Sequence, residues 1–362
     1  MRNSSDKIFI GTMSGTSHDG IDICAIKSSN QISLLKFSSY NYAASLNADI
    51  SNVMQQQELS LEKYYDLNHK IGIAFSGSIK KFLAQHKISK SSVAAIGLSG
   101  QTLFHKPKGK YPFSIQAGDP KIVANKCEID VVSDFRNDHI KFGGEGAPLV
   151  PEFHQKIFSK KNVPLVVLNI GGISNFTYLN GRENFYGSDC GPGNALMDIF
   201  CQKFLYRSFD KNGEHAKSGK VHMPSLNKML SHSFFKRRHP KSTGKEIFNI
   251  EFIPKQLLKK SSNDILATLT ELTAISIAKS LLSLKKSPYQ VIACGGGVKN
   301  SFLMSAIEKH TKLSVTSTSE YGFNPQAIEA MAFGWMARQR IFNNPLVVKK
   351  NKGLLGTITK SR

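Results

Sequence analysis

The sequence predicts an α/β protein built from two similar lobes. A predicted strand, a glycine-containing turn and a second strand follow one another twice, at about 7–28 and 164–180. The chain has 362 residues, which is long for one hydrophobic core, and 40% of them are hydrophobic. We therefore expect two α/β lobes, each beginning with a glycine-tipped β-hairpin, that face a common cleft.

The first half of the chain alternates strand and helix patterns. The predicted strands lie at 7–13, 21–27, 32–37, 93–98 and 130–135, and a predicted helix lies at about 59–86. Asp119 followed by Pro120 predicts the start of another helix, because aspartate caps a helix N-terminus and proline fits its first position. Residues 143–148 contain too much glycine for regular structure.

The second half repeats this alternation. Strands are predicted at 163–170, 176–179 and 291–294, and helices at about 194–204, from near 300 and at about 325–342. One apolar face of the last helix follows the helical period and consists of Ile328, Met331, Ala332 and Trp335. Residues 208–262 are polar and rich in Lys, Ser and His, which predicts insertion loops and short helices.

These patterns predict the domain boundaries. We expect an N-terminal lobe at 1–128, completed by a C-terminal helix at about 338–362. We expect the C-terminal lobe at 129–337, with the insertion at about 208–262.

The chain carries a formal net charge of +22. One interpretation is nucleic-acid binding, and the other is a lysine-rich solvated surface with a general attraction for anions. The basic residues are scattered along the chain, and no zinc-finger spacing or RNA-binding aromatic motif is present. We therefore expect small anionic partners and no nucleic acid.

Cysteine usage and hydropathy indicate a cytoplasmic protein. The five cysteines are odd in number and no two have C-x-x-C spacing, which is typical of reduced thiols and not of a disulfide frame or a metal site. The N-terminus has no apolar signal region, and the apolar runs are shorter than a membrane span. We expect no membrane partner.

A polar loop follows the first predicted strand. It consists of small or acidic residues, interrupted only by His18, namely Ser14, Gly15, Thr16, Ser17, Asp19 and Gly20. Small residues let backbone N–H groups approach an anion, and Asp19 and Asp22 have the chemistry to hold Mg²⁺ directly or through water. The alternative is an ordinary hairpin turn, which needs fewer such residues. The loop is not a Walker A loop, because no Gly-Lys-Ser/Thr follows.

Two further glycine-rich segments follow apolar strands. Gly171 and Gly172 lie in the turn of the second hairpin, where they offer a second anion cradle or a simple tight turn. Together, the two hairpin loops have the composition to grip a nucleotide triphosphate from both sides of a cleft. Gly295, Gly296 and Gly297 follow the strand at 291–294, where a nucleoside could lie against bare backbone or where glycines simply close a tight loop.

Three other residues have the chemistry of a site. Asp189 precedes a glycine turn and a predicted helix, so it is either a general base or a residue that stabilises the helix dipole. Arg136 suits a bidentate grip on a carboxylate or phosphate, with a surface salt bridge as the alternative. Cys190 is interpreted as a small buried thiol, since no His/Cys pairing supports a nucleophile.

Taken together, these segments resemble the anhydro-N-acetylmuramic acid kinase family, from Gly11 to about Ala337. The matching motifs are Met13-Ser14-Gly15-Thr16-Ser17-x-Asp19-Gly20, Gly100-Gln101-Thr102, Gly118-Asp119-Pro120, Asp134-Phe135-Arg136, Gly146-Ala147-Pro148-Leu149-Val150-Pro151, Asn169-Ile170-Gly171-Gly172-Ile173, Asp189-x-Gly191-Pro192-Gly193-Asn194, Ser242-Thr243-Gly244-Lys245-Glu246, Ala267-Thr268-Leu269-Thr270-Glu271-Leu272-Thr273 and Cys294-Gly295-Gly296-Gly297. Each motif alone is weak, but their number and order are specific.

The resemblance implies a two-lobed actin/hexokinase-like (ribonuclease H-like) fold with a nucleotide cleft between the lobes. It also implies a reaction of peptidoglycan recycling, in which 1,6-anhydro-N-acetylmuramic acid, ATP and water give N-acetylmuramic acid 6-phosphate and ADP. Asp189 matches the family's base, which would deprotonate the water that opens the anhydro bridge. The family further suggests a homodimer.

The remaining roles are carried over by motif. The residues expected to bind ATP are Gly15, Thr16, Ser17, His18, Asp19, Gly20, Ile21, Asp22, Gly171, Gly172, Gly295, Gly296 and Gly297. The residues expected to bind the sugar are Ser14, Gln101, Arg136 and Glu329, with Arg136 placed against the lactyl carboxylate. Asp19 and Asp22 are expected to hold Mg²⁺ through phosphates or water.

The chain departs from the family pattern at four positions. We expect an apolar residue where His18 stands, a His at Ser99, a Thr at Cys190 and an Arg at Lys245. Cys190 is the departure nearest to the expected base, but none of the four removes that base.

Two other functions are compatible with the same residues. One is a plain sugar hydroxyl kinase of the same fold, which would not hydrolyse the anhydro ring. The other is a nucleotide-dependent binding module without sugar chemistry, although no filament-type or peptide-binding domain is evident.

Overall fold

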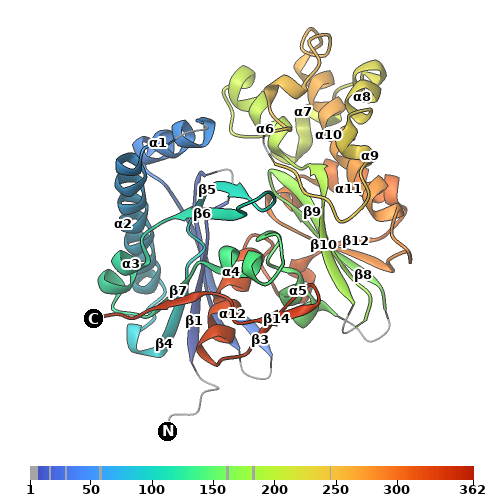
Figure 1. Ribbon diagram of the computed structural model, residues 1–362. Coiled ribbons are helices and arrows are strands. Elements are labelled where there is room, and N and C mark those ends of the chain that lie inside the picture. Colours follow the sequence, from blue (N-terminus) through green and yellow to red (C-terminus); the bar gives the residue numbers. More distant parts are fainter. Residues whose placement is uncertain are drawn as a thin grey trace. The chain divides into compact units, whose positions relative to one another are not determined.

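The computed structural model describes residues 7–15, 18–28, 31–56, 59–159, 163–181, 184–244 and 246–362. The chain forms two compact units. Unit 1 comprises Met1–Phe153 and Ala327–Arg362, and unit 2 comprises His154–Gln326. The chain passes from unit 1 to unit 2 within the helix α5 (Pro151–Phe158) (Figure 1).

Unit 1 is built on a six-stranded sheet in the order β15-β7-β4-β1-β2-β3. Its strands are β1 (Ile8–Met13), β2 (Gly20–Ser28), β3 (Ile32–Asn41), β4 (Val93–Gly97), β7 (Val131–Ser133) and β15 (Thr357–Thr359). The strand β2 runs antiparallel to its neighbours β1 and β3, whereas β4 and β7 run parallel to β1. Two small antiparallel ladders lie outside this sheet, and they are β5 (Gln101–Lys106) with β6 (Phe113–Ala117), and β13 (Leu346–Val348) with β14 (Asn351–Gly353).

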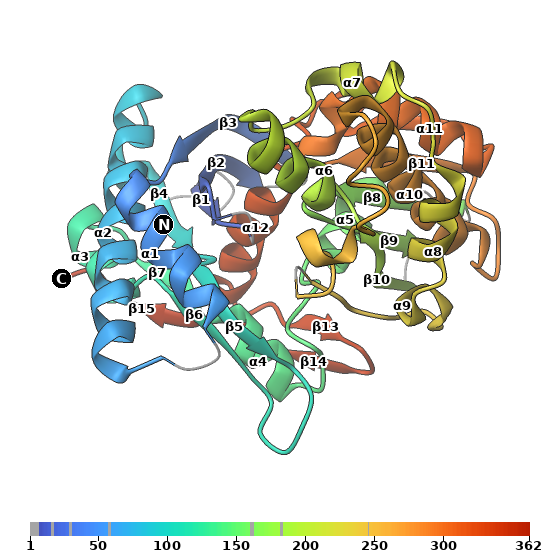
Figure 2. The ribbon, with the colours of Figure 1, turned by 90° about the horizontal axis from the view of Figure 1, so that it is seen from above.

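Helices cover both faces of this sheet (Figure 2). They are α1 (Ala44–Gln55), α2 (Leu61–Gln85), the short turn η2 (Lys90–Ser92), α3 (Pro120–Cys127), α4 (Phe135–Lys141) and α12 (Ile328–Ile341). The helices α2 and α3 contribute Ile71, Phe75 and Val123 to the same hydrophobic core as the strands. On the other face α12 packs closely enough that a Cβ added to Gly11 would lie 1.8 Å from the carbonyl oxygen of Ala330.

Unit 2 is built on a five-stranded sheet in the order β10-β9-β8-β11-β12. Its strands are β8 (Leu165–Ile170), β9 (Ile173–Leu179), β10 (Phe185–Pro192), β11 (Gln290–Cys294) and β12 (Val315–Ser317). Its helices and helical turns are α6 (Ala195–Phe200), the π-helical η3 (Cys201–Leu205), η4 (Lys211–Gly213), α7 (Glu214–Lys217), α8 (Met223–Leu230), α9 (Ser233–Lys236), η5 (Ile250–Phe252), α10 (Ser262–Leu282), η6 (Gly296–Lys299), α11 (Ser301–Thr311) and η7 (Thr318–Tyr321).

The two sheets share one topology. In each, three antiparallel strands that are consecutive along the chain are followed by two strands that run parallel to the first, which are β4 and β7 in unit 1 and β11 and β12 in unit 2. This duplicated arrangement is the ribonuclease H-like unit of actin and hexokinase. The predicted fold class, with two similar α/β units that each begin with a glycine-tipped hairpin, is confirmed.

The units divide at 153/154 and 326/327, and not at the expected 128/129 and 337/338. Residues 129–153 belong to unit 1 because β7 pairs with β4 at the centre of its sheet. The expected C-terminal helix at 338–362 is wrong beyond Ile341, where α12 ends. Residues 346–359 form three short strands instead, and β15 completes the unit 1 sheet by pairing with β7.

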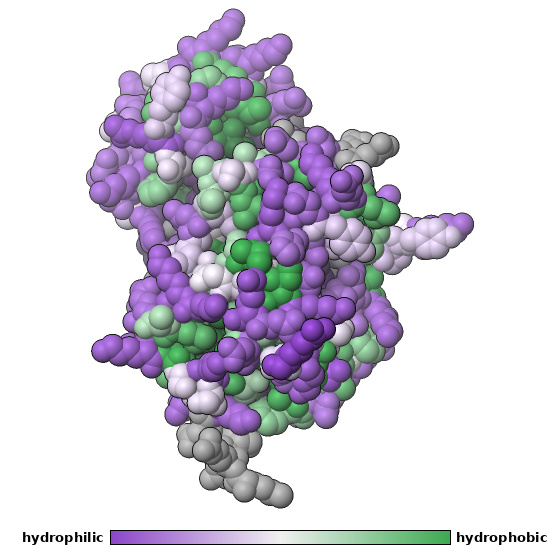
Figure 3. Space-filling view, turned by 90° about the vertical axis from the view of Figure 1, so that its left-hand side faces the viewer, coloured by the Kyte–Doolittle hydropathy of each residue, from purple (hydrophilic) through white to green (hydrophobic). Residues whose placement is uncertain are grey.

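The helix α10 is long and apolar enough to cross a membrane by length and composition alone. However, 78% of its most apolar window is buried in the structure. Ile265, Leu269 and Leu272 of this helix belong to the core cluster of unit 2, so α10 is the core helix of that unit. On the face shown in Figure 3, hydrophilic residues predominate and apolar residues form separate patches.

Candidate active site

The loop between β1 and β2, together with the start of β2, contains most of the predicted phosphate-binding residues. Thr16 and Ser17 lie outside the described residues. His18 adopts a left-handed backbone conformation with φ of 48°, and its N–H donates to the carbonyl oxygen of Gly15 at 3.1 Å. Asp19 is exposed, whereas Ile21 is buried in the sheet, so Ile21 has only its backbone to offer a nucleotide.

Ser14 and Gln101, both predicted to bind the sugar, lie at the base of this loop. The Ser14 hydroxyl is 2.6 Å from Gln101 Oε1, and the two residues form an isolated parallel bridge. Their exposed fractions are 3% and 0%. Tyr42 donates its hydroxyl to Ser14 Oγ at 3.0 Å. The structure therefore brings these two residues together in a buried network, and direct contact with a sugar stays a prediction.

Asp22, the second predicted metal ligand, lies on β2 opposite Ser39 of β3. The Ser39 hydroxyl donates to Asp22 Oδ1 in a short hydrogen bond. Within the described ranges, no group of three or more His, Cys, Asp or Glu side chains has metal-ligand geometry. A role for Asp19 and Asp22 in holding Mg²⁺ stays a prediction from the sequence.

Arg136 lies in the first turn of α4 in unit 1 and is partly buried. Its Nη1 donates to the carbonyl oxygen of Gly146 at 2.8 Å, and its Nε has no hydrogen-bond partner among the residues described. Burial lowers the pKa of the guanidinium, and the Glu329 carboxylate opposes that shift. The structure thus brings the two predicted sugar-binding residues Arg136 and Glu329 into one electrostatic environment.

Gly146 is held from a second side. Its N–H donates to His139 Nδ1 at 2.9 Å, which requires that nitrogen to be unprotonated. Burial, with a further contribution from Arg136, lowers the pKa of His139 to about 4. The loop at 143–148 is therefore pinned at Gly146 by both Arg136 and His139.

In unit 2, the second glycine loop forms one piece with the start of α6. The carbonyl oxygen of Gly171 accepts from the N–H of Asn194 at 2.8 Å, and that of Gly172 accepts from the N–H of Gly193 at 2.9 Å. A Cβ on Gly193 would lie 2.2 Å from the carbonyl oxygen of Gly171. This close approach explains the Gly-x-Gly spacing around Pro192 and fixes the tip of the hairpin.

The third glycine segment lies beside the second. Strands β8 and β11 are parallel neighbours with Asn169 opposite Cys294. Both loops therefore follow the carboxyl ends of adjacent strands. Gly295 has φ of 85°, and its Cβ would lie 2.4 Å from Asn169 Oδ1. A Cβ on Gly296 would meet nothing within 4 Å. The structure therefore brings these two predicted nucleotide-binding segments together.

Asp189 lies on β10, ahead of the glycine turn and α6 as predicted, and faces Asn175 of β9 next to the second glycine loop. The register shifts between Asp189 and Gly191, which leaves Cys190 as the extra residue of a bulge. Bulges redirect side chains at sheet edges. Asp189 Oδ2 accepts from the backbone N–H of Thr243 at 2.8 Å, and the Asp189 N–H donates to the carbonyl oxygen of Lys241 at 2.9 Å.

Sequence reasoning missed the side chains that surround Asp189. Lys241 Nζ donates to the carbonyl oxygen of Phe234 at 3.2 Å and lies 4.4 Å from the centre of its ring. Burial lowers the pKa of Lys241, while Cys190 and Asp189 oppose this shift, which places the Lys241 amine in the electrostatic surroundings of the candidate base. The motif matched at 242–246 directly follows Lys241, but no local sequence pattern indicated that this segment lies beside β10.

Cys190 is fully buried, as expected of a structural thiol. Burial raises the pKa of its thiol to about 12, and Ser280 and Ser174 interact with it. A thiol held protonated in this way is a poor nucleophile. The departure from the family pattern at Cys190 therefore affects packing beside Asp189 and adds no chemistry. Lys245, another departure, lies outside the described residues.

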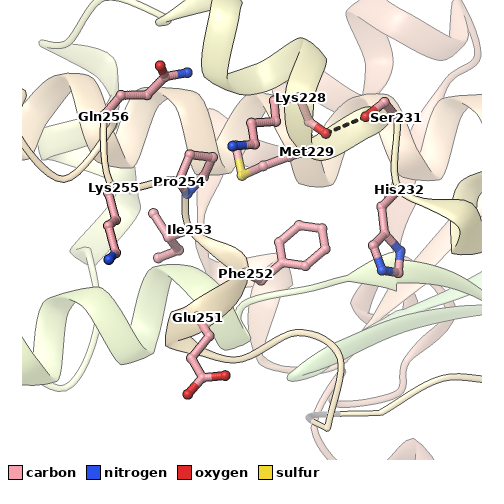
Figure 4. Close-up of a pocket in the computed structure, with 10 residues that line it drawn as sticks. All are labelled: Lys228, Met229, Ser231, His232, Glu251, Phe252, Ile253, Pro254, Lys255 and Gln256. Carbon is pink, nitrogen blue, oxygen red and sulfur yellow. Dashed lines mark hydrogen bonds between the residues drawn. The ribbon is translucent and has the colours of Figure 1, made fainter.

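Two surface hollows lie apart from the predicted residues. One in unit 2 has a volume of about 720 Å³ and is lined by Lys228, Met229, Ser231, His232, Glu251, Phe252, Ile253, Pro254, Lys255 and Gln256 (Figure 4). One in unit 1 has a volume of about 510 Å³ and is lined by Ser39, Tyr40, Asn41, Tyr42, Ala43, Leu46, Ala74, Gly77, Ser78 and Lys81. Neither lining includes a residue predicted to bind ATP or sugar.

Comparison with known proteins gave consistent matches. A family model described as anhydro-N-acetylmuramic acid kinase matches residues 7–359. The anhydro-N-acetylmuramic acid kinase of Gamma-proteobacterium EBAC31A08 is 45% identical over 362 residues, which cover 99% of this chain and 100% of that protein. The kinase of the same name from Pasteurella multocida (strain Pm70) is 40% identical and covers 93% of this chain and 91% of its own length.

Solved structures are only distantly similar. An activator of 2-hydroxyisocaproyl-CoA dehydratase from Clostridium difficile has a TM-score of 0.48 at 10% identity and covers 93% of this chain and 96% of its own. A glucokinase from Streptomyces griseus has a TM-score of 0.42 at 11% identity and covers 92% of this chain and 99% of its own. Neither likeness bears on function.

Proposed function

The chain belongs to the anhydro-N-acetylmuramic acid kinase family, and we propose that Asp189 is the base of its reaction. The reaction converts 1,6-anhydro-N-acetylmuramic acid, ATP and water into N-acetylmuramic acid 6-phosphate and ADP, in the recycling of peptidoglycan. The observation that carries the base assignment is the position of Asp189 on the β10 bulge, held by the Thr243 N–H beside the second glycine loop.

Asp189 takes a proton from a water molecule as the water oxygen bonds to the anomeric carbon of the sugar. The bond from this carbon to O6 breaks, and O6 attacks the γ-phosphorus of ATP, with ADP as the leaving group. The Thr243 N–H supports this role because it restrains the orientation of the carboxylate. Lys241 interacts electrostatically with Asp189.

ATP phosphates are assigned to the loop at 15–22 and to Gly171 and Gly172, and the nucleoside to residues 295–297. The open space at Gly296 supports the last assignment. Asp19 and Asp22 would hold Mg²⁺ through water or phosphate oxygens, and the ion would neutralise phosphate charge. That both hairpin loops hold one nucleotide stays a prediction from the sequence.

Arg136 and Glu329 are assigned to the sugar. A buried guanidinium whose Nε lacks a hydrogen-bond partner in the described part of the chain supports a ligand carboxylate, and the lactyl group supplies one. We further propose a cytoplasmic homodimer that binds small molecules and neither nucleic acid nor membrane. Light scattering of the purified protein tests the dimer.

Incubation of the purified protein with the anhydro sugar and ATP in ¹⁸O-labelled water tests the reaction. We expect one ¹⁸O at the anomeric oxygen of a 6-phosphorylated product. A phosphorylated product without label would identify a plain sugar kinase. ADP release that is indifferent to the sugar would identify a nucleotide-dependent module, and either result would overturn the proposal.

A further inference from the structure

The segment from Tyr42 to Asn47, which contains the start of α1, holds the backbone of the loop between β1 and β2. The Tyr42 N–H donates to the carbonyl oxygen of Asp19 at 3.1 Å. The Asn47 Nδ2 donates to the carbonyl oxygen of His18 at 2.7 Å. Both contacts lie within unit 1 and act on consecutive peptide groups of the loop.

Ser14 and Gln101 hold the two ends of the same loop. Ser14 Oγ donates to the carbonyl oxygen of Gly20 at 2.9 Å, and Gln101 Nε2 donates to that of Gly15 at 3.2 Å. The Tyr42 hydroxyl donates to Ser14 Oγ, so the buried phenol connects the two sets of contacts. Burial raises the pKa of Tyr42, which keeps this phenol protonated as a donor.

These contacts decide which backbone groups the loop presents. Carbonyl oxygens carry partial negative charge and repel phosphate, whereas N–H groups attract it. The carbonyl oxygens of Gly15, His18, Asp19 and Gly20 are all engaged by donors of unit 1. A loop held in this way keeps these four carbonyl oxygens occupied and away from an incoming anion.

The same contacts account for His18. A non-glycine residue with φ of 48° is disfavoured and persists where its surroundings hold it in place. The hydrogen bond from Asn47 to the His18 carbonyl supplies such a restraint. His18 is therefore a conformational element of the loop.

We propose that Tyr42 and Asn47 are positioning residues for ATP, and that Ser14 and Gln101 act with them on the loop. This inference rests on the proposed function, because it assumes that the loop binds phosphate. None of these four residues needs to touch the nucleotide.

The test uses Tyr42→Phe and Asn47→Ala in the full-length protein. Tyr42→Phe removes one oxygen and keeps the N–H that holds Asp19. The matched controls are Tyr40→Phe, since this hydroxyl donates to Gln85 away from the loop, and Asn52→Ala, since this side chain is exposed on the same helix. Dissociation constants for a non-hydrolysable ATP analogue are measured by calorimetry without sugar, and KM values for ATP and for sugar are measured separately.

We expect the dissociation constant and KM for ATP to rise about 3- to 10-fold in both variants, as for one lost hydrogen bond. The KM for sugar of both variants should stay within about 2-fold of wild type, and so should all of these constants in the two control variants. Unchanged ATP affinity in Tyr42→Phe and Asn47→Ala would overturn the inference, as would a rise confined to the sugar KM. A wild type that binds the analogue but never phosphorylates the anhydro sugar would refute the proposed function and leave this inference standing.

Discussion

Asp189 Oδ2 accepts a hydrogen bond from the backbone N–H of Thr243 at 2.8 Å, although the two residues are 54 positions apart in the sequence. The donor is a backbone group, so no change of side chain at Thr243 other than proline removes it. The Thr243 hydroxyl itself is buried without a hydrogen-bond partner among the described residues. The backbone N–H and the side-chain hydroxyl of Thr243 can therefore be tested separately.

Asp189→Asn should abolish turnover and leave nucleotide binding intact. The amide oxygen of Asn still accepts the Thr243 N–H, so geometry is kept while the base is lost. We expect kcat to fall roughly 10²- to 10⁴-fold, the usual contribution of a general base. ADP formation with the anhydro sugar measures this. Glu214→Gln, an exposed carboxylate change in unit 2, serves as the control. Activity within a few-fold of wild type in Asp189→Asn would exclude Asp189 as the base.

Thr243→Val should stabilise the protein and preserve its activity. Valine has the shape of threonine, keeps the N–H and removes a buried hydroxyl that has no described partner. We expect the free energy of unfolding to rise by about 1 kcal/mol, measured by urea denaturation. kcat should be unchanged. If the KM for sugar increases more than about 10-fold, the hydroxyl binds substrate, since a loss of that size corresponds to about one hydrogen bond.

Gly11→Ala should destabilise unit 1, whereas Gly77→Ala should not. A Cβ on Gly11 would lie 1.8 Å from the Ala330 carbonyl oxygen, so β1 and α12 would have to separate. We expect a loss of at least about 3 kcal/mol. Gly77 lies in α2, and a Cβ there would meet nothing within 4 Å, so alanine should add about 0.5–1 kcal/mol. Thermal denaturation compares the two, and equal stabilities would contradict the packing of α12 on β1.

The sequence correctly predicted helix caps, helices and hairpins that depend on residues close together in the chain. The cap at Asp119 is confirmed, since its side chain accepts from the Lys121 N–H at 2.8 Å and Pro120 begins α3. The helix expected at about 59–86 is α2, and both glycine-tipped hairpins are present. These features depend on residues a few positions apart. The local context of Asp189 left its role open, and its assignment as the base comes from the family resemblance and stays a prediction.

Features that depend on distant partners were not predictable in this way. The strand β15 exists because Thr357–Thr359 pairs with Val131–Ser133, and a helix at this end was expected instead. The helix α1 and the hairpin of β5 and β6 were not expected at all. Asn47 and Tyr42 act on the loop only because the chain after β3 returns to it, so their role follows from tertiary structure and not from a motif.

Stability should fall as pH decreases from about 6.5 to about 4. Burial lowers the pKa of His139 and His239 to about 4 and that of His154 to about 3, from an ordinary value of 6.5. Across this window the unfolded chain binds more protons than the native protein, so the free energy of unfolding decreases as pH falls. Burial raises the pKa of Asp134 and Glu152, which opposes the trend only where carboxyl groups titrate.

Urea denaturation at pH 7.5, 6.0 and 5.0 measures this dependence, and we expect a loss of at least about 2 kcal/mol between pH 7.5 and 5.0. His139→Asn is the matched variant, because its side-chain oxygen accepts the Gly146 N–H and does not titrate. Its stability should depend less steeply on pH than that of wild type. A flat profile in wild type would mean that these histidines are not held neutral in the native state. Equal slopes in the two proteins would remove His139 from the explanation and leave it to His105, His154 and His239.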